Sequence, residues 1–165
     1  MSLSRCLRAL FLAGGLLGAT AAHALCTLTC SCNASVTSIV FATYNPLASG
    51  NSTSTGRIRV SCGGVAGLAI PYTVALSAGI GTLGARTMGA GAGRLAYNLY
   101  TTSSYSTIWG DGSGATATVG GGFLLDVLGT APPQDLTVYG RIPGSQGAVA
   151  PGAYADTLVV TLTYF

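Results

Sequence analysis

The stretch just before the C-terminal phenylalanine has an alternating pattern that predicts a β-strand. Over residues 157–164, apolar or aromatic side chains alternate with a second set that is mostly threonine. The apolar face consists of Leu158, Val160, Leu162 and Tyr164. Successive side chains of a strand point to opposite faces, so one face of this strand is apolar. An apolar face has to be covered, and the fold of the chain therefore depends on what covers residues 157–164.

Shorter runs of the same kind recur along the chain, and none has the 3.6-residue period of a helix. In each run apolar and polar residues alternate, or an apolar segment is bounded by Gly, Pro or Asn. The predicted strands are Ser35–Phe41, Arg57–Cys62, Ile70–Ser77, Arg94–Thr101, Ala115–Val119, Phe123–Leu128 and Leu136–Gly140. Residues 48–55, 78–93 and 103–114 are rich in Gly, Ala or Ser and predict loops or irregular structure. These features predict an all-β fold, a β-sandwich with little helix.

Residues 1–24 have the features of a secretory signal peptide. A basic start precedes the apolar segment Ala9–Thr20, and the small-x-small sequence Ala-His-Ala follows at 22–24. The apolar segment is too short to span a bilayer, which takes about 20 residues. We therefore expect an exported chain whose mature part, residues 25–165, is one domain.

The mature part carries very little charge. Its basic side chains are five arginines and its acidic ones four aspartates, and the whole chain contains neither Lys nor Glu. Charged residues make up 7% of the sequence, against about 25% in ordinary soluble domains. Such a chain has no basic patch for nucleic acid or an anionic membrane. It also lacks the charges that usually protect sheet edges, which indicates a surface that another chain covers.

Four cysteines, Cys26, Cys30, Cys32 and Cys62, lie in the mature part. An even number in an exported chain favours disulfides, and four cysteines allow three connectivities, which the sequence alone leaves open. A metal site is the competing interpretation of the cluster at 26–32. Its C-x3-C-x-C spacing differs from the usual C-x2-C pattern, and the one histidine of the chain lies in the leader. We therefore expect neither a metal nor a cofactor.

One segment matches a nucleotide-binding motif by spacing alone. Residues 79–84 have the G-x-G-x-x-G pattern, but the Gly/Ala-rich residues that follow do not propagate the helix that would bind a pyrophosphate. Nucleophilic catalysis needs a general base, and the mature part offers only aspartates. These are isolated in the sequence and predict roles in turns or at strand edges, namely Asp111, Asp126, Asp135 and Asp156. The sequence thus predicts a protein that is not an enzyme.

Three aromatic residues near one loop are candidates for a binding surface. Tyr100, Tyr105 and Trp109 lie in or beside the segment 103–114, and loops are where binding residues concentrate. The alternative is that these rings pack in the core, as most aromatic side chains do. We take the three residues as a candidate adhesive loop for a surface or a carbohydrate ligand.

A series of short motifs follows in a specific order along the mature part. They are Cys32 with SVTSIVFATYNPL (35–47), TGRIRVSC (55–62), PYTVALS (71–77), LAYNLY (95–100), WGDG (109–112), VYGRIP (138–143) and PGAYADT (151–157). In this order and spacing the chain resembles the spore coat protein U domain family, which includes subunits of archaic chaperone–usher pili. Gly152 and Tyr164 also occupy positions where pilins of the wider class tend to carry Gly and Tyr.

The resemblance implies an immunoglobulin-like β-sandwich that lacks its last strand. In the family, a periplasmic chaperone lends a strand beside the C-terminal strand, and the N-terminal extension of the next subunit then replaces it. The partners implied are thus a periplasmic pilus chaperone, an outer-membrane usher and neighbouring pilus subunits, with passage through the periplasm to the cell surface. The resemblance also implies a Cys32–Cys62 disulfide and, with it, a Cys26–Cys30 disulfide. The implied docking residues are Leu158, Val160, Leu162 and Tyr164.

The segment ahead of Cys32 is shorter than a donor strand needs. Polymerising pilins of this kind carry a donor segment on the order of fifteen residues there, whereas the expected mature part has only Leu25–Ser31. We therefore expect a structural or adhesive fibre subunit that receives a strand and occupies a terminal, tip position. The sequence is also compatible with a spore or cell-surface coat protein, or with a free exported carbohydrate-binding β-domain.

Overall fold

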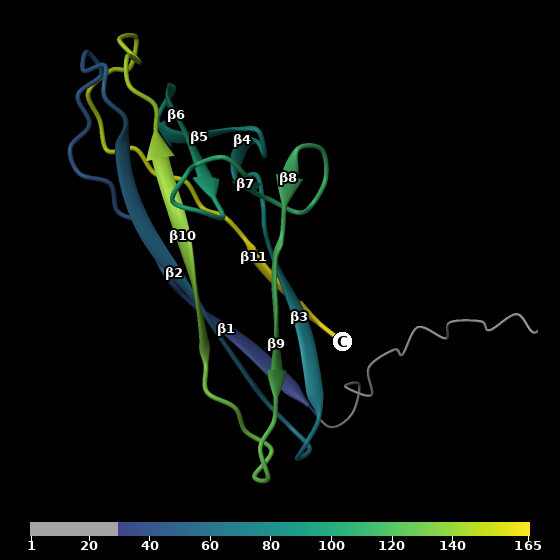
Figure 1. Ribbon diagram of the computed structural model, residues 1–165. Coiled ribbons are helices and arrows are strands. Elements are labelled where there is room, and N and C mark those ends of the chain that lie inside the picture. The colour runs from purple at the N-terminus through teal and green to yellow at the C-terminus, as the bar shows by residue number, and fades with distance from the viewer. Residues whose placement is uncertain (1–29) are drawn as a thin grey trace, which may run out of the picture.

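The structure is a computed structural model that describes residues 30–165, and in this range the chain forms strands and connecting segments without a helix (Figure 1). The predicted all-β fold is confirmed. The predicted signal peptide, residues 1–24, lies outside the described residues. The strands are β1 Ser31–Thr37, β2 Ser52–Gly63, β3 Ala69–Leu76, β4 Ile80–Thr82, β5 Ala85–Ala90, β6 Gly93–Tyr100, β7 Ile108–Trp109, β8 Thr116–Ala117, β9 Val119–Leu124, β10 Gln134–Ile142 and β11 Val160–Tyr164.

The larger sheet is built around two long antiparallel strands, β2 and β10, which lie side by side in Figure 1. Its strand order is β1-β2-β10-β6-β5-β4, and β7 pairs with β6 and with β8. The sequence of β2 alternates polar and apolar residues, so its buried side chains lie on one face. These inward side chains are Ile58, Val60 and Cys62.

The smaller sheet contains the C-terminal strand. Its order is β11-β3-β9, and both neighbouring pairs are antiparallel. Val74, in the middle of β3, lies opposite Leu162 of β11 and Val119 of β9. The period-two pattern of β3 again produces one buried face, formed by Ile70, Tyr72, Val74 and Leu76.

The core lies between the two sheets. Tyr72 of β3 stacks on Phe123 of β9 with ring centroids 5.4 Å apart. Trp109 of β7 is fully buried, and its indole Nε1 donates a hydrogen bond to the carbonyl of Val74 at 2.9 Å. The larger sheet contributes side chains from β2, β6 and β10, among them Val60, Leu95, Leu99 and Val138. The two layers form a β-sandwich of the immunoglobulin-like kind.

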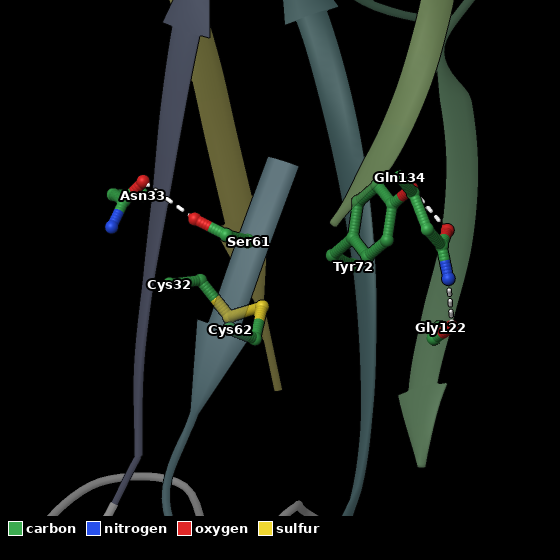
Figure 2. Close-up of a disulfide and its surroundings, with 7 residues drawn as sticks. All are labelled: Cys32, Asn33, Ser61, Cys62, Tyr72, Gly122 and Gln134. Atoms are coloured by element: carbon green, nitrogen blue, oxygen red, sulfur yellow. Dashed lines mark hydrogen bonds between the residues drawn. A yellow bond between two sulfur atoms is a disulfide. The ribbon is translucent and has the colours of Figure 1, made fainter. Parts of the chain in front are cut away.

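A disulfide joins the first strand to the second. Figure 2 shows Cys32 of β1 bonded to Cys62 of β2, directly opposite it in the antiparallel register. This is the pairing that the resemblance implied. The bridge spans a sequence separation of 30 residues, for which loop closure gives a stabilisation of about 3–4 kcal/mol. Cys30 is disulfide-bonded as well. Because Cys26 lies outside the described residues, the Cys26–Cys30 pairing stays a prediction.

A polar contact connects the two sheets in the surroundings of this disulfide (Figure 2). The side chain of Gln134, at the start of β10, accepts a hydrogen bond from the Tyr72 hydroxyl at 2.7 Å and donates one to the carbonyl of Gly122 at 2.6 Å. Burial raises the pKa of Tyr72, so its hydroxyl stays protonated and needs an acceptor. Gln134 therefore fixes β10 against β3 and β9.

The predictions of loop structure were wrong at three places. Residues 78–93 contain the strands β4 and β5, because β5 pairs with β6 in a regular register that a Gly/Ala-rich sequence does not reveal. Residues 52–55 belong to β2, where Ser54 lies opposite Gly140. The segment 103–114 contains the short strand β7, which pairs with the end of β6.

Several strand boundaries also differ from the prediction, and the C-terminal strand begins at Val160 rather than Thr157. The first strand, β1, begins at Ser31 rather than Ser35 and ends at Thr37, because its pairing with β2 extends around the disulfide. The strand predicted to end at Leu128 ends at Leu124. The side chain of Asp126 accepts hydrogen bonds from the backbone nitrogens of Leu128 and Thr130, which turns the chain there.

Candidate functional site

The C-terminal strand β11 is paired on one edge only. It stands at the end of the strand order, with β3 as its neighbour. Ser77 N donates to Val159 O at 3.0 Å, and Phe165 N donates to Pro71 O at 3.1 Å, so the odd-numbered residues direct their backbone groups at β3. In an antiparallel pair this direction alternates along the strand. The backbone groups of residues 160, 162 and 164 therefore face the other edge of β11. No strand within residues 30–165 pairs with that edge.

The same even-numbered residues direct their side chains toward the core. The predicted docking residues are half-buried and pack against the core, namely Leu158, Val160, Leu162 and Tyr164. Between them, Val159 is 64% exposed, and Thr161 and Thr163 are exposed. From residue 160 on, β11 thus combines inward apolar side chains with free backbone hydrogen-bonding groups at its edge, which is what an added strand requires.

The segment 38–44, which continues from β1, stands opposite β11. It has no strand ladder of its own, but Ser54 Oγ donates a hydrogen bond to the carbonyl of Val40 at 2.7 Å. Ile39 and Phe41 lie over two glycines of the larger sheet. A Cβ added to Gly56 would lie 2.6 Å from Ile39 Cγ1, and one added to Gly140 would lie 2.7 Å from the Phe41 ring. The missing side chains therefore allow this segment to lie close to β2 and β10.

An apolar groove of about 970 Å³ lies between the segment 38–44 and β11. Leu158 and Val160 line it, while Leu162 and Tyr164 continue the same strand face beyond its lining residues. The other lining residues include inward side chains of β2, β6 and β10, which also belong to the core. They are Ile58, Leu95, Tyr97, Leu99, Val138 and Ile142. The groove therefore gives direct access to the core alongside β11.

One part of the groove is polar. The Tyr97 hydroxyl donates a hydrogen bond to Asp156 Oδ2 at 2.6 Å, and both residues line the groove. Asp156 Oδ1 accepts from the backbone nitrogens of Ile80 at 3.0 Å and Thr157 at 2.8 Å. Burial, with the Asp156 hydrogen bond as a second cause, raises the pKa of Tyr97 far above its usual range, so the hydroxyl remains the donor. Asp156 thereby fixes the segment that leads into β11 against the start of β4.

A sequence profile of the Spore Coat Protein U domain matches residues 17–161, which is most of the chain. The chain belongs to the Spore Coat Protein U domain family. The resemblance seen in the sequence motifs is thereby confirmed. No curated protein sequence gives a significant match.

The fold of this Spore Coat Protein U domain is similar to that of a chain in a crystal structure of a CsuC-CsuE complex. That complex is described as a chaperone-tip adhesion subunit pre-assembly complex from archaic chaperone-usher Csu pili of Acinetobacter baumannii. The TM-score is 0.53 and the sequence identity 20%, over 81% of this chain. The match spans 39% of the length of the Csu chain. At this identity the likeness shows a shared fold.

In this Spore Coat Protein U domain, the sequence identified one wall of the groove and missed the other. Ile39 and Phe41 both belong to the predicted strand Ser35–Phe41. The sequence does not indicate that they face β11 across a groove. A usable signal was present, because Ile39 and Phe41 alternate beyond the end of β1 while Gly56 and Gly140 interrupt the two strands beneath them. Apolar side chains opposite strand glycines indicate a segment that lies flat over a sheet.

The candidate adhesive loop is divided by the structure. Trp109 does not reach the surface, because its ring is fully buried and its Nε1 bonds to Val74 O. Tyr100 and Tyr105 do lie together, with ring centroids 5.4 Å apart, near Tyr139 and Arg141. The placement of Trp109 in an adhesive surface was therefore wrong, whereas the two tyrosines form part of another cluster.

The aspartates of the domain have local partners. Hydrogen bonds from Ser113 lower the pKa of Asp111, and bonds from Thr130 and Leu128 lower the pKa of Asp126, as in side-chain-closed turns. Asp135 lies 3.3 Å from Arg57. Within residues 30–165 there is no cluster of three metal-ligating side chains. The same part of the chain has no helix long and apolar enough to cross a membrane.

Proposed function

We propose that this chain is a non-enzymatic subunit of an exported surface fibre, in which a strand from another polypeptide binds in the groove beside β11. The observation that carries this proposal is the free edge of β11 above an apolar groove that reaches the core. An added strand would satisfy the backbone groups of 160, 162 and 164 and would place alternate side chains in the groove. Family membership, together with the fold shared with a chain of the chaperone–usher pilus complex, supports the same function.

The apolar surface around the groove supports a strand as its occupant. Val36 and Val40 line the groove and are 55% and 78% exposed. A strand beside residues 158–164 would extend over about 23 Å at ~3.3 Å per residue. Burying three of its aliphatic side chains would contribute roughly 5–9 kcal/mol before the entropy of ordering the strand is subtracted. The backbone hydrogen bonds to residues 160, 162 and 164 would add to this contribution.

The expected partners follow from the same site. A periplasmic chaperone would supply the first strand and a neighbouring subunit the second, with an outer-membrane usher as the site of exchange. The similar Csu structure is of a chaperone–subunit pre-assembly complex, which supports a chaperone as the first partner. Export through the periplasm to the cell surface is part of this proposal, and the sequence features of residues 1–24 support it.

The direct test is expression of the full chain with and without a periplasmic pilus chaperone. With the chaperone we expect a soluble one-to-one complex after export, and without it aggregation or degradation, because an apolar groove and a free strand edge stay open. The measurement is size-exclusion chromatography with mass determination of the periplasmic extract. A stable monomer that forms without any bound strand would contradict the proposed function.

The terminal position in the fibre is a separate prediction. It rests on the short segment Leu25–Ser31, of which residues 25–29 lie outside the described part of the chain. If the subunit receives a strand but donates none, displacement of the chaperone by a synthetic donor peptide should yield single complemented subunits. Native gel electrophoresis after displacement distinguishes these from ladders of polymers. Polymers of this chain alone would show that it can donate a strand.

A further inference from the structure

Three tyrosines and one arginine form a cluster on the outer face of the larger sheet. Tyr139 of β10 lies directly opposite Tyr100, the last residue of β6. Tyr105, from the loop after β6, lies edge-on to both, with ring centroids 5.4 Å from Tyr100 and 6.5 Å from Tyr139. The guanidinium carbon of Arg141 lies 4.9 Å from the Tyr100 ring centroid and 5.2 Å from that of Tyr105. Aromatic rings therefore hold this cation in place.

The charge of Arg141 has no carboxylate partner in the described part of the chain. The ion pairs in residues 30–165 join Arg57 and Arg59 to Asp135. The one hydrogen bond of the Arg141 guanidinium is that from Nη2 to the Tyr100 hydroxyl at 3.0 Å, and its buried Nε lacks an acceptor. In a domain with so few charges, a positioned guanidinium with unused donors is suited to a carboxylate ligand.

The loop that carries Tyr105 adds polar groups to the same place. Tyr105 has a φ of 54°, a left-handed conformation that is uncommon for a residue other than Gly, Asn or Asp and that often marks a functional constraint. Around it, the hydroxyls of Thr102, Ser104 and Ser106 form a chain with spacings of 2.8 and 3.0 Å. All three are exposed. The strained loop thus presents one ring and three hydroxyls together.

The cluster lies apart from the groove. Val138 and Ile142 of β10 point inward and line the groove. Tyr139 and Arg141 alternate with these inward positions along the strand and therefore face outward. Tyr105, Tyr139 and Arg141 are half-buried, so part of each is accessible. A ligand at this cluster can therefore bind while the groove is filled.

We propose that Arg141, Tyr100, Tyr105 and Tyr139 form a binding site for an acidic saccharide, with the sugar carboxylate on the Arg141 guanidinium. The accessible parts of Tyr105 and Tyr139 contact the apolar face of the sugar ring, and the Thr102, Ser104 and Ser106 hydroxyls bond to its hydroxyls. This combination favours a saccharide over an acidic peptide, because a peptide carboxylate would use the arginine and leave the exposed hydroxyl chain unused.

The test measures binding of the full chain, purified in the complex in which it is exported, to oligogalacturonate by isothermal titration calorimetry. The same oligosaccharide with its carboxylates methyl-esterified keeps the rings and removes the charge, and polyglutamate keeps the charge and removes the rings. We expect binding to oligogalacturonate at least about tenfold tighter than to either control, since a charge-assisted hydrogen bond is lost with the ester. Equal binding of polyglutamate or of the ester, or no binding of oligogalacturonate, would overturn the proposal.

Variants locate the site on the chain. Arg141→Gln should weaken binding about tenfold or more, whereas Arg59→Gln removes the same charge from an exposed side chain of β2 and should leave binding unchanged. Tyr105→Asn removes the ring while Asn tolerates the left-handed φ, so this variant should fold and still bind more weakly. Equal losses in Arg141→Gln and Arg59→Gln, or full binding by Tyr105→Asn, would argue against the site.

Discussion

Replacement of Leu162 by Asp is expected to abolish capture of this Spore Coat Protein U domain by a chaperone. The Leu162 side chain is half-buried against the core, and its backbone groups face the free edge of β11. A carboxylate at this position would have to be desolvated when a strand binds, at a free-energy cost of several kcal/mol. That corresponds to a loss of more than about a hundredfold in affinity. Val160→Asp should act in the same way, and the measurement is the amount of chain that co-purifies with the chaperone.

A neighbouring residue provides the matched control. Thr161→Asp adds the same charge one position away, on the exposed face of β11, and should leave capture unchanged. Val160→Pro tests the edge itself, because it removes an N–H that faces away from β3 and so spares the ladder between β11 and β3. This variant should retain the Cys32–Cys62 disulfide and lose capture. Normal capture of Leu162→Asp and Val160→Asp would show that β11 is not the docking strand.

The sequence predicted best where burial and alternation coincide within one short segment. β3 has four inward apolar positions at period two and β11 has three, and the inward faces of both strands follow directly from the sequence. β5 was missed because its strand state depends on pairing with β6, where Met88 lies opposite Leu95, rather than on its own Gly/Ala-rich sequence. Local propensity is a weak signal for strands whose partners lie elsewhere in the chain.

The candidate site shows the same limit. The inward residues of β11 follow from the alternation, but the opposite wall of the groove depends on how Ile39 and Phe41 pack over Gly56 and Gly140, residues distant in sequence. Trp109 was placed at the surface because its segment has a loop-like composition, although β7 returns to pair with β6 and buries the ring. Contacts between distant segments determine both the opposite wall of the groove and the burial of Trp109. The hydrophobic period of a single segment does not predict such contacts.

Replacement of Arg86 by Met is expected to destabilise the domain by about 3 kcal/mol or more. Arg86 is fully buried on β5, forms no ion pair with a carboxylate of residues 30–165, and has its pKa lowered by burial. Its guanidinium donates to the carbonyls of Ser77 at 2.8 Å and Trp109 at 2.9 Å, and to Asn98 Oδ1 at 2.7 Å. Met fills similar space but leaves the two carbonyls without these donors, and a buried unsatisfied carbonyl costs about 1–3 kcal/mol. The measurement is the free energy of unfolding in urea, with the groove filled by the same strand in each variant.

The position of Arg86 relates this loss of stability to the groove. The carbonyl of Ser77 accepts from Arg86, and its N–H donates to the carbonyl of Val159, the residue just before β11. Release of Ser77 should therefore loosen the beginning of β11 and weaken strand capture as well. Arg94→Met is the control, since exposed Arg94 also donates to two carbonyls, those of Gly91 and Gly93, which water can serve instead. We expect the free energy of unfolding of Arg94→Met to stay within about 0.5 kcal/mol of that of the unchanged chain. If Arg86→Met and Arg94→Met had equal effects, the buried guanidinium would not be what fixes β3 and β7 together beside the groove.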